Sequence, residues 1–222
     1  MAVVTISREA GSGAEEIARR VCEMLDYAYL DKELMASVAA EVGLTEAGLT
    51  ETDVIDYSEK NYEVKNFIER ILRPGPRWVG HVVTPVVTEE GIETLTLRQL
   101  NETECINLIK GTLRAAYHKD NIVVIGRGGQ SILREMPKAL HVRIDAPLKQ
   151  RIQRVHEQQK VNWEDARESI LDHDDAAAQY LYQFFGIQWD DPLLYHLVIN
   201  TGRWSVEAAA QIIVDAVKLL KD

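Results

Sequence analysis

The chain has 222 residues, of which 46% are hydrophobic and 27% are charged. This composition excludes the disordered and fibrous classes, and the length suits one sizeable domain that carries an insertion. Aspartate and glutamate number 35 against 25 lysines and arginines, which gives a net charge of −10. That charge argues against a broad nucleic-acid or anionic-membrane surface, but it is compatible with a small anion held in a locally basic cleft.

The sequence shows no pattern typical of a membrane span, a signal peptide or a disulfide framework. No apolar run reaches the roughly 18 residues of a membrane span. No basic segment precedes the short apolar N-terminus, so we expect no signal peptide. The cysteines, Cys22 and Cys105, lack metal-ligand spacing and are too few for a disulfide framework. We therefore expect a reduced, cytoplasmic protein.

The first 43 residues alternate strand and helix patterns. Residues 2–7 are apolar and rich in β-branched side chains, which is typical of a strand buried on both faces. A glycine-containing loop and a helix with one apolar stripe follow, so the segment predicts half of a βαβ unit. Residues 27–30 are predicted as a second strand and 32–41 as a helix that Gly43 ends.

Residues 45–100 lack the alternating strand and helix pattern of the first segment, and they contain an acidic run at 51–59 and a helix-like stretch at 62–72. A proline inside 81–87 argues against a central strand there. We interpret 45–100 as an insertion or subdomain over the core, followed by a helix from about Thr96 to Tyr117.

The α/β rhythm then resumes. Further strands are predicted at 121–125, 139–144 and 195–200. Further helices are predicted from Pro147, from Trp163 to about Phe184 with Asn162 as its cap, and after the cap Ser205. Strands alternating with helices predict a mostly parallel sheet covered on both faces.

Three loops leave the carboxyl ends of predicted strands, where ligands bind in open α/β sheets. They span residues 8–13, 126–129 and 200–203, and each contains glycine and one arginine: Arg8, Arg127 and Arg203. Glycines let backbone N–H groups approach a phosphate, and arginine adds charge-assisted hydrogen bonds. The alternative for each loop is an ordinary turn. For Arg203 the alternative is a surface cation, and there we favour this alternative.

Other polar residues give weaker indications of chemistry. The six histidines show no ligand spacing. Asp172, Asp174 and Asp175 could bind a metal, but we favour a solvated acidic helix face. The aromatic residues near 180–196 are interpreted as packing a helix on the sheet.

Several segments, taken in order, resemble the cytidylate kinase-like family, relatives of the P-loop nucleoside monophosphate (NMP) kinases. They are TISREAGSG at 5–13, YLDK at 29–32, VIGRGG at 124–129, APL at 146–148 followed by Arg151 and Arg154, and WDDP at 189–192 with the later tyrosine and Asn-Thr at 195–201. The resemblance covers nearly the full chain and is vague over 45–100.

The resemblance implies a single α/β domain with a three-layer P-loop kinase-like fold. It would contain a five-stranded parallel sheet flanked by helices, an inserted NMP-binding-like helical region at 45–100, and a lid-like helical segment at about 156–185. The implied reaction transfers the γ-phosphoryl group of ATP to CMP or dCMP, with Mg²⁺ between the phosphates.

The resemblance also implies site residues. ATP phosphates would lie on Gly11, Ser12, Gly13, Ala14, Glu15 and Glu16. The acceptor would be held by Asp31, Lys32, Gly126, Arg127 and Gly128. Arg8, Arg127 and Arg167 would be the catalytic cations. The implied partners are small-molecule nucleotides, with neither nucleic acid nor membrane, and a homodimer through 45–100 is a further expectation.

Two departures from the family pattern bear on activity. A full P-loop reads G-x-x-x-x-G-K-[ST], but alignment on Gly13 puts Ala14 at the lysine and Glu15 at the hydroxyl. The lid tends to read Asp-Arg-x-Arg where this chain has residues 174–177, DDAA, leaving Arg151, Arg154 and Arg167 as the nearby cations. Ile125 also replaces the aspartate of an Asp-Gly-Arg acceptor motif.

Three functions therefore stay open. The first is an active cytidylate-type kinase in which Arg8 replaces the missing lysine. The second is a catalytically impaired nucleotide-binding or regulatory protein that keeps the kinase fold. The third is a phosphotransferase with a different small acceptor.

Overall fold

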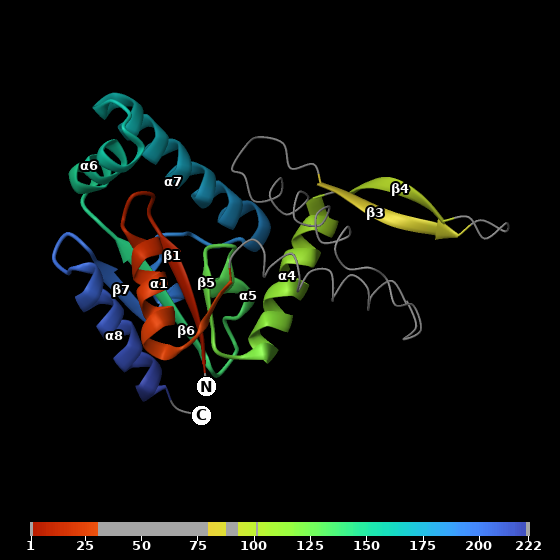
Figure 1. Cartoon of the computed structure of the whole chain (residues 1–222), viewed down its shortest axis with the longest axis horizontal. Helices are drawn as coiled ribbons and strands as arrows, with labels where there is room; N and C mark the ends of the chain where they lie inside the picture. The colour runs from red at the N-terminus through yellow and green to blue at the C-terminus, as the bar shows by residue number, and fades with distance from the viewer. Residues whose placement is uncertain (1, 31–79, 88–92, 101, 221–222) are drawn as a thin grey trace. The chain divides into compact units, whose positions relative to one another are not determined.

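The computed structural model describes residues 2–30, 80–87, 93–100 and 102–220 (Figure 1). The chain divides into two compact units, Met1–Leu30 with Ala116–Asp222 and, separately, Asp31–Ala115. Each unit is described by itself.

The first unit is built on a five-stranded sheet in the order β2-β5-β1-β6-β7, and every neighbouring pair is parallel. The strands are β1 (Val3–Arg8), β2 (Ala28–Leu30), β5 (Ile122–Ile125), β6 (Ala139–Asp145) and β7 (Leu197–Asn200). The predicted five-stranded parallel sheet is thus confirmed. One strand begins later than predicted, because Tyr195 closes a short 3-10 helix, Pro192–Leu194, before β7 starts.

Helices cover both faces of this sheet. They are α1 (Ala14–Leu25), α5 (Gly129–Ile132), α6 (Leu148–Gln159), α7 (Trp163–Phe185) and α8 (Val206–Leu219). The predicted caps are confirmed: Asn162 accepts from the Asp165 amide at 2.8 Å and Ser205 from the Ala208 amide at 3.2 Å. In the described part of the chain, no helix combines the length and apolar character of a membrane span.

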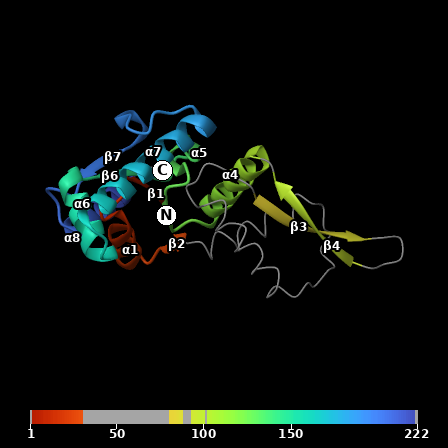
Figure 2. The same cartoon turned by 90° about the horizontal axis from the view of Figure 1, so that it is seen from above.

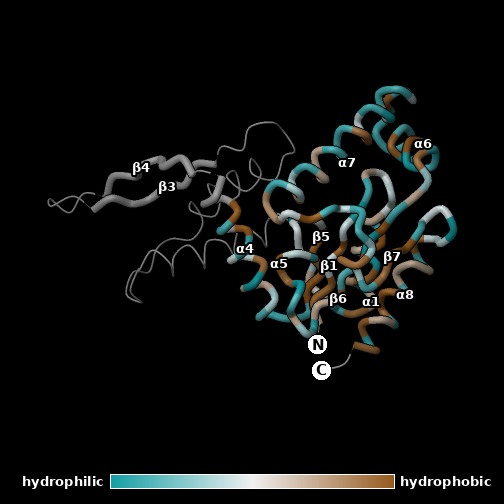
Figure 3. The backbone as a smooth tube through the Cα atoms, turned by 180° about the vertical axis from the view of Figure 1, so that it is seen from behind, coloured by the Kyte–Doolittle hydropathy of each residue, from teal (hydrophilic) through white to brown (hydrophobic). Residues whose placement is uncertain are grey.

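The core lies between the sheet and the pair α1 and α8, which run side by side in Figures 1 and 2. Val4 and Ile6 of β1 pack there with Ile17 of α1 and Ile213 of α8, and all four side chains are inaccessible to solvent. Figure 3 shows this apolar centre inside more hydrophilic outer helices. Burial of these side chains is the main stabilising contribution of the unit.

Polar side chains occupy the opposite face of the same strands. Adjacent strand residues point to opposite sides, so Thr5 and Ser7 of β1 face away from α1 and α8. His141 and Arg143 of β6 share that alternation, and all four are buried. The sheet therefore has one apolar face and one buried polar face, and the polar face leads toward the strand ends.

The described part of the second unit contains a β-hairpin. Strand β3 (Gly80–Val87) pairs antiparallel with β4 (Glu93–Leu100), from Gly80 opposite Leu100 to Val87 opposite Glu93. The helix predicted from about Thr96 to Tyr117 begins later, at Glu102, because ETLTLRQL alternates polar and apolar residues with the period of a strand. The hairpin also corrects the predicted helical character of the 45–100 insertion, because residues 80–87 and 93–100 of it are strands.

Helix α4 (Glu102–Lys119) follows this hairpin. Several predictions lie outside the described residues. These are the helices at 32–41 and 62–72, the acidic run at 51–59, and the acceptor residues Asp31 and Lys32.

Candidate functional site

The first loop of the site, residues 9–13, joins β1 to α1 through two glycines in the left-handed region. Gly11 has φ 75° and Gly13 has φ 84°. Gly13 is the N-cap of α1 and supplies no side-chain hydrogen bond. The N–H groups of the first helical turn therefore have no intrahelical acceptor, which is the arrangement that binds anions at helix N-termini.

Helix α6 packs tightly against this first loop. A Cβ atom on Gly11 would lie 2.9 Å from the carbonyl oxygen of Arg151, so only glycine fits. Arg154 donates through Nη1 to the Gly11 carbonyl at 3.2 Å and to Thr201 Oγ1 at 3.1 Å. Its Nη1 would be 3.7 Å from a Cβ on Gly13. A guanidinium therefore stands beside the loop that lacks the P-loop lysine.

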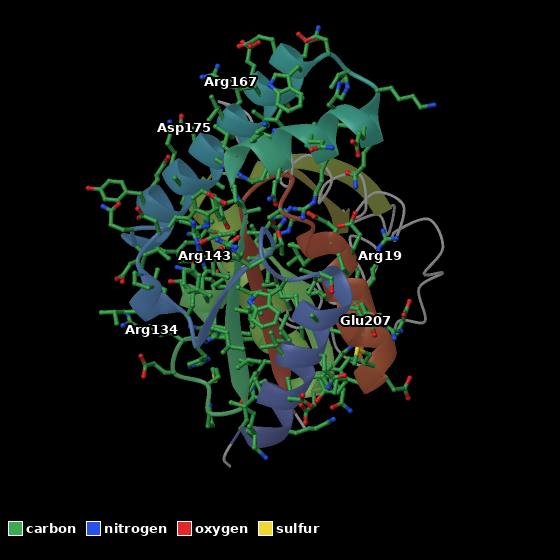
Figure 4. All side chains as sticks on the ribbon, turned by 90° about the vertical axis from the view of Figure 1, so that its left-hand side faces the viewer. Arg19, Arg134, Arg143, Arg167, Asp175 and Glu207 are labelled. Atoms are coloured by element: carbon green, nitrogen blue, oxygen red, sulfur yellow. The ribbon has the colours of Figure 1, made fainter. Side chains whose placement is uncertain are left out.

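Asp174 of α7 fixes the start of the first loop. Its Oδ1 accepts from the Ala10 amide at 2.8 Å, and its Oδ2 accepts from Arg151 Nη1 at 2.6 Å. The two side chains are only 16% and 7% exposed. The interpretation of a solvated acidic face was therefore wrong for Asp174, whereas Asp175 is exposed (Figure 4).

Ser12 lies at the centre of the first loop and is inaccessible to solvent. Its Oγ has no hydrogen-bond partner among the described residues, although its carbonyl accepts from Thr201 Oγ1 at 2.7 Å. A buried hydroxyl without a partner costs free energy, and an oxyanion on this loop would remove that cost. The donors present thus fit a phosphate chain.

The two carboxylates on the first turn of α1 have different partners. Glu15 forms an ion pair with Arg8 Nε at 2.8 Å, and both side chains are partly exposed. Glu16 accepts from Gln158 Nε2 at 3.0 Å at the surface. Arg8 therefore offsets one of the two negative charges that would oppose an approaching phosphate.

The second loop of the site, residues 126–128, follows β5 with three consecutive left-handed residues. Gly126, Arg127 and Gly128 have φ values of 70°, 63° and 73°. A non-glycine residue at positive φ is uncommon, so the backbone holds Arg127 in a costly conformation. The Gly126 amide donates to the Ile6 carbonyl at 2.8 Å, which ties this loop to β1.

A cleft opens where these strand ends meet α7, and the space free of protein atoms in and just outside it measures about 350 Å³. Its lining comprises Ser7, Arg8, Gly126, Arg127, Gly128, Gln130, Ala177, Tyr180, Leu181 and Trp189. The structure thus brings together the predicted residues Arg8 and Arg127. A Cβ atom on Gly126 would lie 3.1 Å from Arg8 Nη1, so this guanidinium reaches over the second loop.

Arg127 is one of the two positively charged residues that line the cleft. Burial, together with the neighbouring charge of Arg8, lowers the pKa of its guanidinium to about 10. Arg127 nevertheless stays protonated at neutral pH. Within the described ranges no carboxylate forms an ion pair with it, so a bound anion would be favoured there.

The far wall of the cleft depends on Trp189. Its Nε1 donates to Ser7 Oγ at 2.9 Å. Tyr195 donates from its hydroxyl to the Trp189 carbonyl at 2.8 Å. Arg143 lies 4.6 Å from the indole centre and pairs with Asp145 at 2.7 Å. The sequence predicted only helix packing for this aromatic cluster, whereas Trp189 lines the candidate site.

Some predicted site residues are not brought to the cleft. Arg167 pairs with Glu164 at 3.2 Å on the exposed side of α7, away from Arg143 in Figure 4. Arg203 is exposed, as expected for a surface cation. Gln130, which the sequence reasoning missed, follows the second loop directly, and its position after a glycine loop was the available signal.

Comparison with known proteins agrees with this geometry. The model of the cytidylate kinase-like family matches residues 3–203. The chain belongs to the cytidylate kinase-like family. A cytidylate kinase from Halobacterium salinarum is 31% identical over 74 residues, covering 33% of this chain but only 38% of that enzyme. A cytidylate kinase from Methanosphaerula palustris is 26% identical over 147 residues, 64% of this chain and 82% of that enzyme.

The fold also has a counterpart among solved structures. The crystal structure of an uncharacterized protein from Eubacterium ventriosum superimposes with a TM-score of 0.62, covering 98% of this chain and 99% of that one. Its sequence identity is 18%, so the likeness concerns the fold alone. The parallel sheet flanked by helices, together with the family match, is consistent with the α/β P-loop kinase-like fold.

Proposed function

We propose that this chain is an ATP-dependent nucleoside monophosphate kinase of the cytidylate type, which phosphorylates CMP or dCMP. One observation carries the proposal. At the ends of the adjacent parallel strands β1 and β5, a cleft is lined by Arg8 and by Arg127, which has no carboxylate partner in the described part of the chain, and the uncapped helix α1 begins after the same end of β1. Two anion-binding places side by side are what transfer between two phosphates requires.

The roles of the residues follow from their positions. The amides at the start of α1, the Ser12 hydroxyl and Arg154 would bind the phosphates of ATP. Arg127 would hold the acceptor phosphate, with Arg8 between the two loops. Catalysis of this kind consists mostly of positioning and of charge stabilisation.

Magnesium would enter with the nucleotide. When bound, Mg²⁺ neutralises charge between the phosphates, and it commonly uses only one or two protein carboxylates besides phosphate oxygens. Glu15 and Glu16 are the carboxylates on the first turn of α1, which directly follows the first loop. Among the described residues, no three histidine, cysteine, aspartate or glutamate side chains cluster as a ready-made metal site.

Phosphorus NMR on folded protein with Mg-ATP and CMP tests the proposal. We expect β-phosphate signals of CDP and ADP to grow together. Arg127→Gln should reduce the rate by about 1000-fold, since loss of a positioned arginine at a phosphoryl group has effects of this size. Arg134→Gln is the matched control, because Arg134 is 60% exposed and lies outside the cleft lining. Equal rates in both variants would contradict the assignment.

A second candidate is a nucleotide-binding protein without kinase activity. It is favoured because the α7 side chains that line the cleft include no arginine or lysine. Ala177 stands there, and the cation of the same helix, Arg167, pairs with Glu164 outside. Calorimetric binding of CMP or ATP without any diphosphate product would support this candidate. A screen of other small phosphate acceptors would separate it from a phosphotransferase with a different substrate.

A further inference from the structure

Gln130 is a buried polar residue in the wall of the cleft. It stands in the first turn of α5 and its side chain is only 2% exposed. Its Nε2 has no hydrogen-bond partner among the described residues. It lines the same cleft as Arg8 and Arg127, in which the acceptor anion is proposed to bind.

An amide in this position is unfavourable for the ligand-free protein. A buried N–H group without an acceptor keeps the full cost of its lost hydration, whereas an apolar side chain of similar size does not. Arg127 of the second loop is a second donor in the same cleft, and no carboxylate in the described part of the chain forms an ion pair with it. Both groups would be satisfied by one oxygen-rich ligand.

We propose that Gln130 is a specificity-determining residue whose Nε2 donates a hydrogen bond to an oxygen of the acceptor's phosphate group. This inference rests on the proposed function. Arg8, Arg127 and Gln130 are then three donors around one group. A phosphate monoester offers three non-bridging oxygens, one for each donor, whereas a carboxylate offers two. The third donor is uncharged, so it favours a tetrahedral oxyanion without adding another like charge beside Arg127.

The experiment compares wild-type protein with Gln130→Leu and Gln130→Glu, using inorganic phosphate and CMP as calorimetric probes. We expect Gln130→Leu to weaken both affinities about 10-fold, the usual size of one hydrogen bond to a charged group. Gln130→Glu should weaken them further, because its carboxylate would pair with Arg127 and repel phosphate. Gln211→Leu is the matched control, since its amide donates to Asp215 on the outer side of α8.

Thermal unfolding of the ligand-free proteins separates a binding role from a structural one. Because Nε2 has no hydrogen-bond partner among the described residues, Gln130→Leu should leave the midpoint of the ligand-free protein unchanged or higher. A lowered midpoint with unchanged affinities would overturn the inference. The side-chain amide signals of Gln130 in wild-type NMR spectra should also shift on phosphate titration, and static signals would overturn it without any variant.

The outcomes also distinguish this inference from the proposed function. Binding that Arg127→Gln abolishes but Gln130→Leu leaves intact would overturn the role of Gln130 alone. Absence of binding of both probes to the wild-type protein would overturn the proposed function together with this inference. Should Gln130→Leu fail to fold, Gln130→Met supplies the same loss of the donor with a more adaptable side chain.

Discussion

The first and second loops both follow a central strand and both depend on left-handed glycines, but their polar groups are in different states. Around the first loop the ionic groups have protein partners: Asp174 binds Arg151 and the Ala10 amide, and Arg8 binds Glu15. The second loop presents Arg127 and Gln130 without such partners in the described chain. The first loop is therefore fixed before ligand binding, whereas the second should gain stability from a ligand.

The largest expected effect concerns the Asp174 clamp, which consists of the contacts of Asp174 with Arg151 and with the Ala10 amide of the first loop. Asp174→Asn removes one charge of a nearly buried ion pair and leaves Arg151 without its closest carboxylate. We expect the free energy of unfolding to fall by about 3 kcal/mol, as for other broken buried pairs. Urea denaturation measures this loss. Asp175→Asn, at an exposed residue that accepts from Gln179, should cost less than about 0.5 kcal/mol, and similar losses in the two variants would argue against the clamp.

The next effect concerns the support beneath the second loop. Gly129 packs on Thr5, whose hydroxyl lies 2.7 Å from His141 Nδ1. Burial, aided by His196, lowers the pKa of His141 to about 4 from its ordinary 6.5. Between these values the unfolded chain binds a proton that the folded protein does not, so stability falls as pH drops from 6.5 to 4. The loss at this residue should be about 3 kcal/mol.

Unfolding measured across this pH range in the wild type and His141→Asn checks that slope. The variant should show a shallower dependence. His156→Asn, at an exposed histidine, should keep the wild-type slope. An unchanged slope in His141→Asn would show that other groups cause the acid sensitivity.

Backbone geometry gives a third, smaller effect. Gly128 and Gly186 are both left-handed, but a Cβ on Gly128 would lie 2.6 Å from Phe185, whereas one on Gly186 would meet nothing within 4 Å. Alanine at either site has the conformational cost of a left-handed residue, roughly 1 kcal/mol. Gly128→Ala should lose about 2 kcal/mol more because of the clash. Chemical denaturation of the two variants measures the difference, and equal losses would exclude a tight fit against α7.

The smallest effect tests the ion pair between Arg8 and Glu15, which lie on either side of the first loop. Glu15→Gln should change the free energy of unfolding by less than about 1 kcal/mol, because the pair is partly exposed. Release of Arg8 should strengthen phosphate binding roughly 2- to 5-fold, with a larger gain at low salt. Glu23→Gln breaks an exposed pair with Arg20 on the same helix and should leave affinity unchanged. Unaltered binding in Glu15→Gln would mean that Arg8 does not contact the anion.

Local sequence patterns were sufficient for much of the fold. Residues 2–7, the glycine loop and the stripe through Ile17 predicted the first strand, loop and helix, and the caps Asn162 and Ser205 lie where their side chains predicted. These features depend on neighbouring residues only. The strand at Glu93–Leu100 was missed even though its alternation was present, because the helix that follows it was extended backward over its last residues.

The site was predicted in part. Arg8 and Arg127 were expected together because carboxyl ends of parallel strands meet at one edge of a sheet. Arg167 was expected to act as a catalytic cation, but α7 directs it to the exposed side. Gln130 and Trp189 were not selected, since nothing local distinguishes a glutamine with an unpaired amide from one that is solvated.

The sequence alone determined the order of strands and helices, the two glycine loops and the resemblance to a kinase family, because periodicity, capping and motif spacing are properties of short segments. Only the tertiary structure decided which charges meet. Asp174 binds the Ala10 amide across 164 residues of chain, and the aspartate thereby becomes a clamp. Pairing at such separations depends on how α6 and α7 pack against the sheet, and the same packing leaves Arg127 and Gln130 available to a ligand.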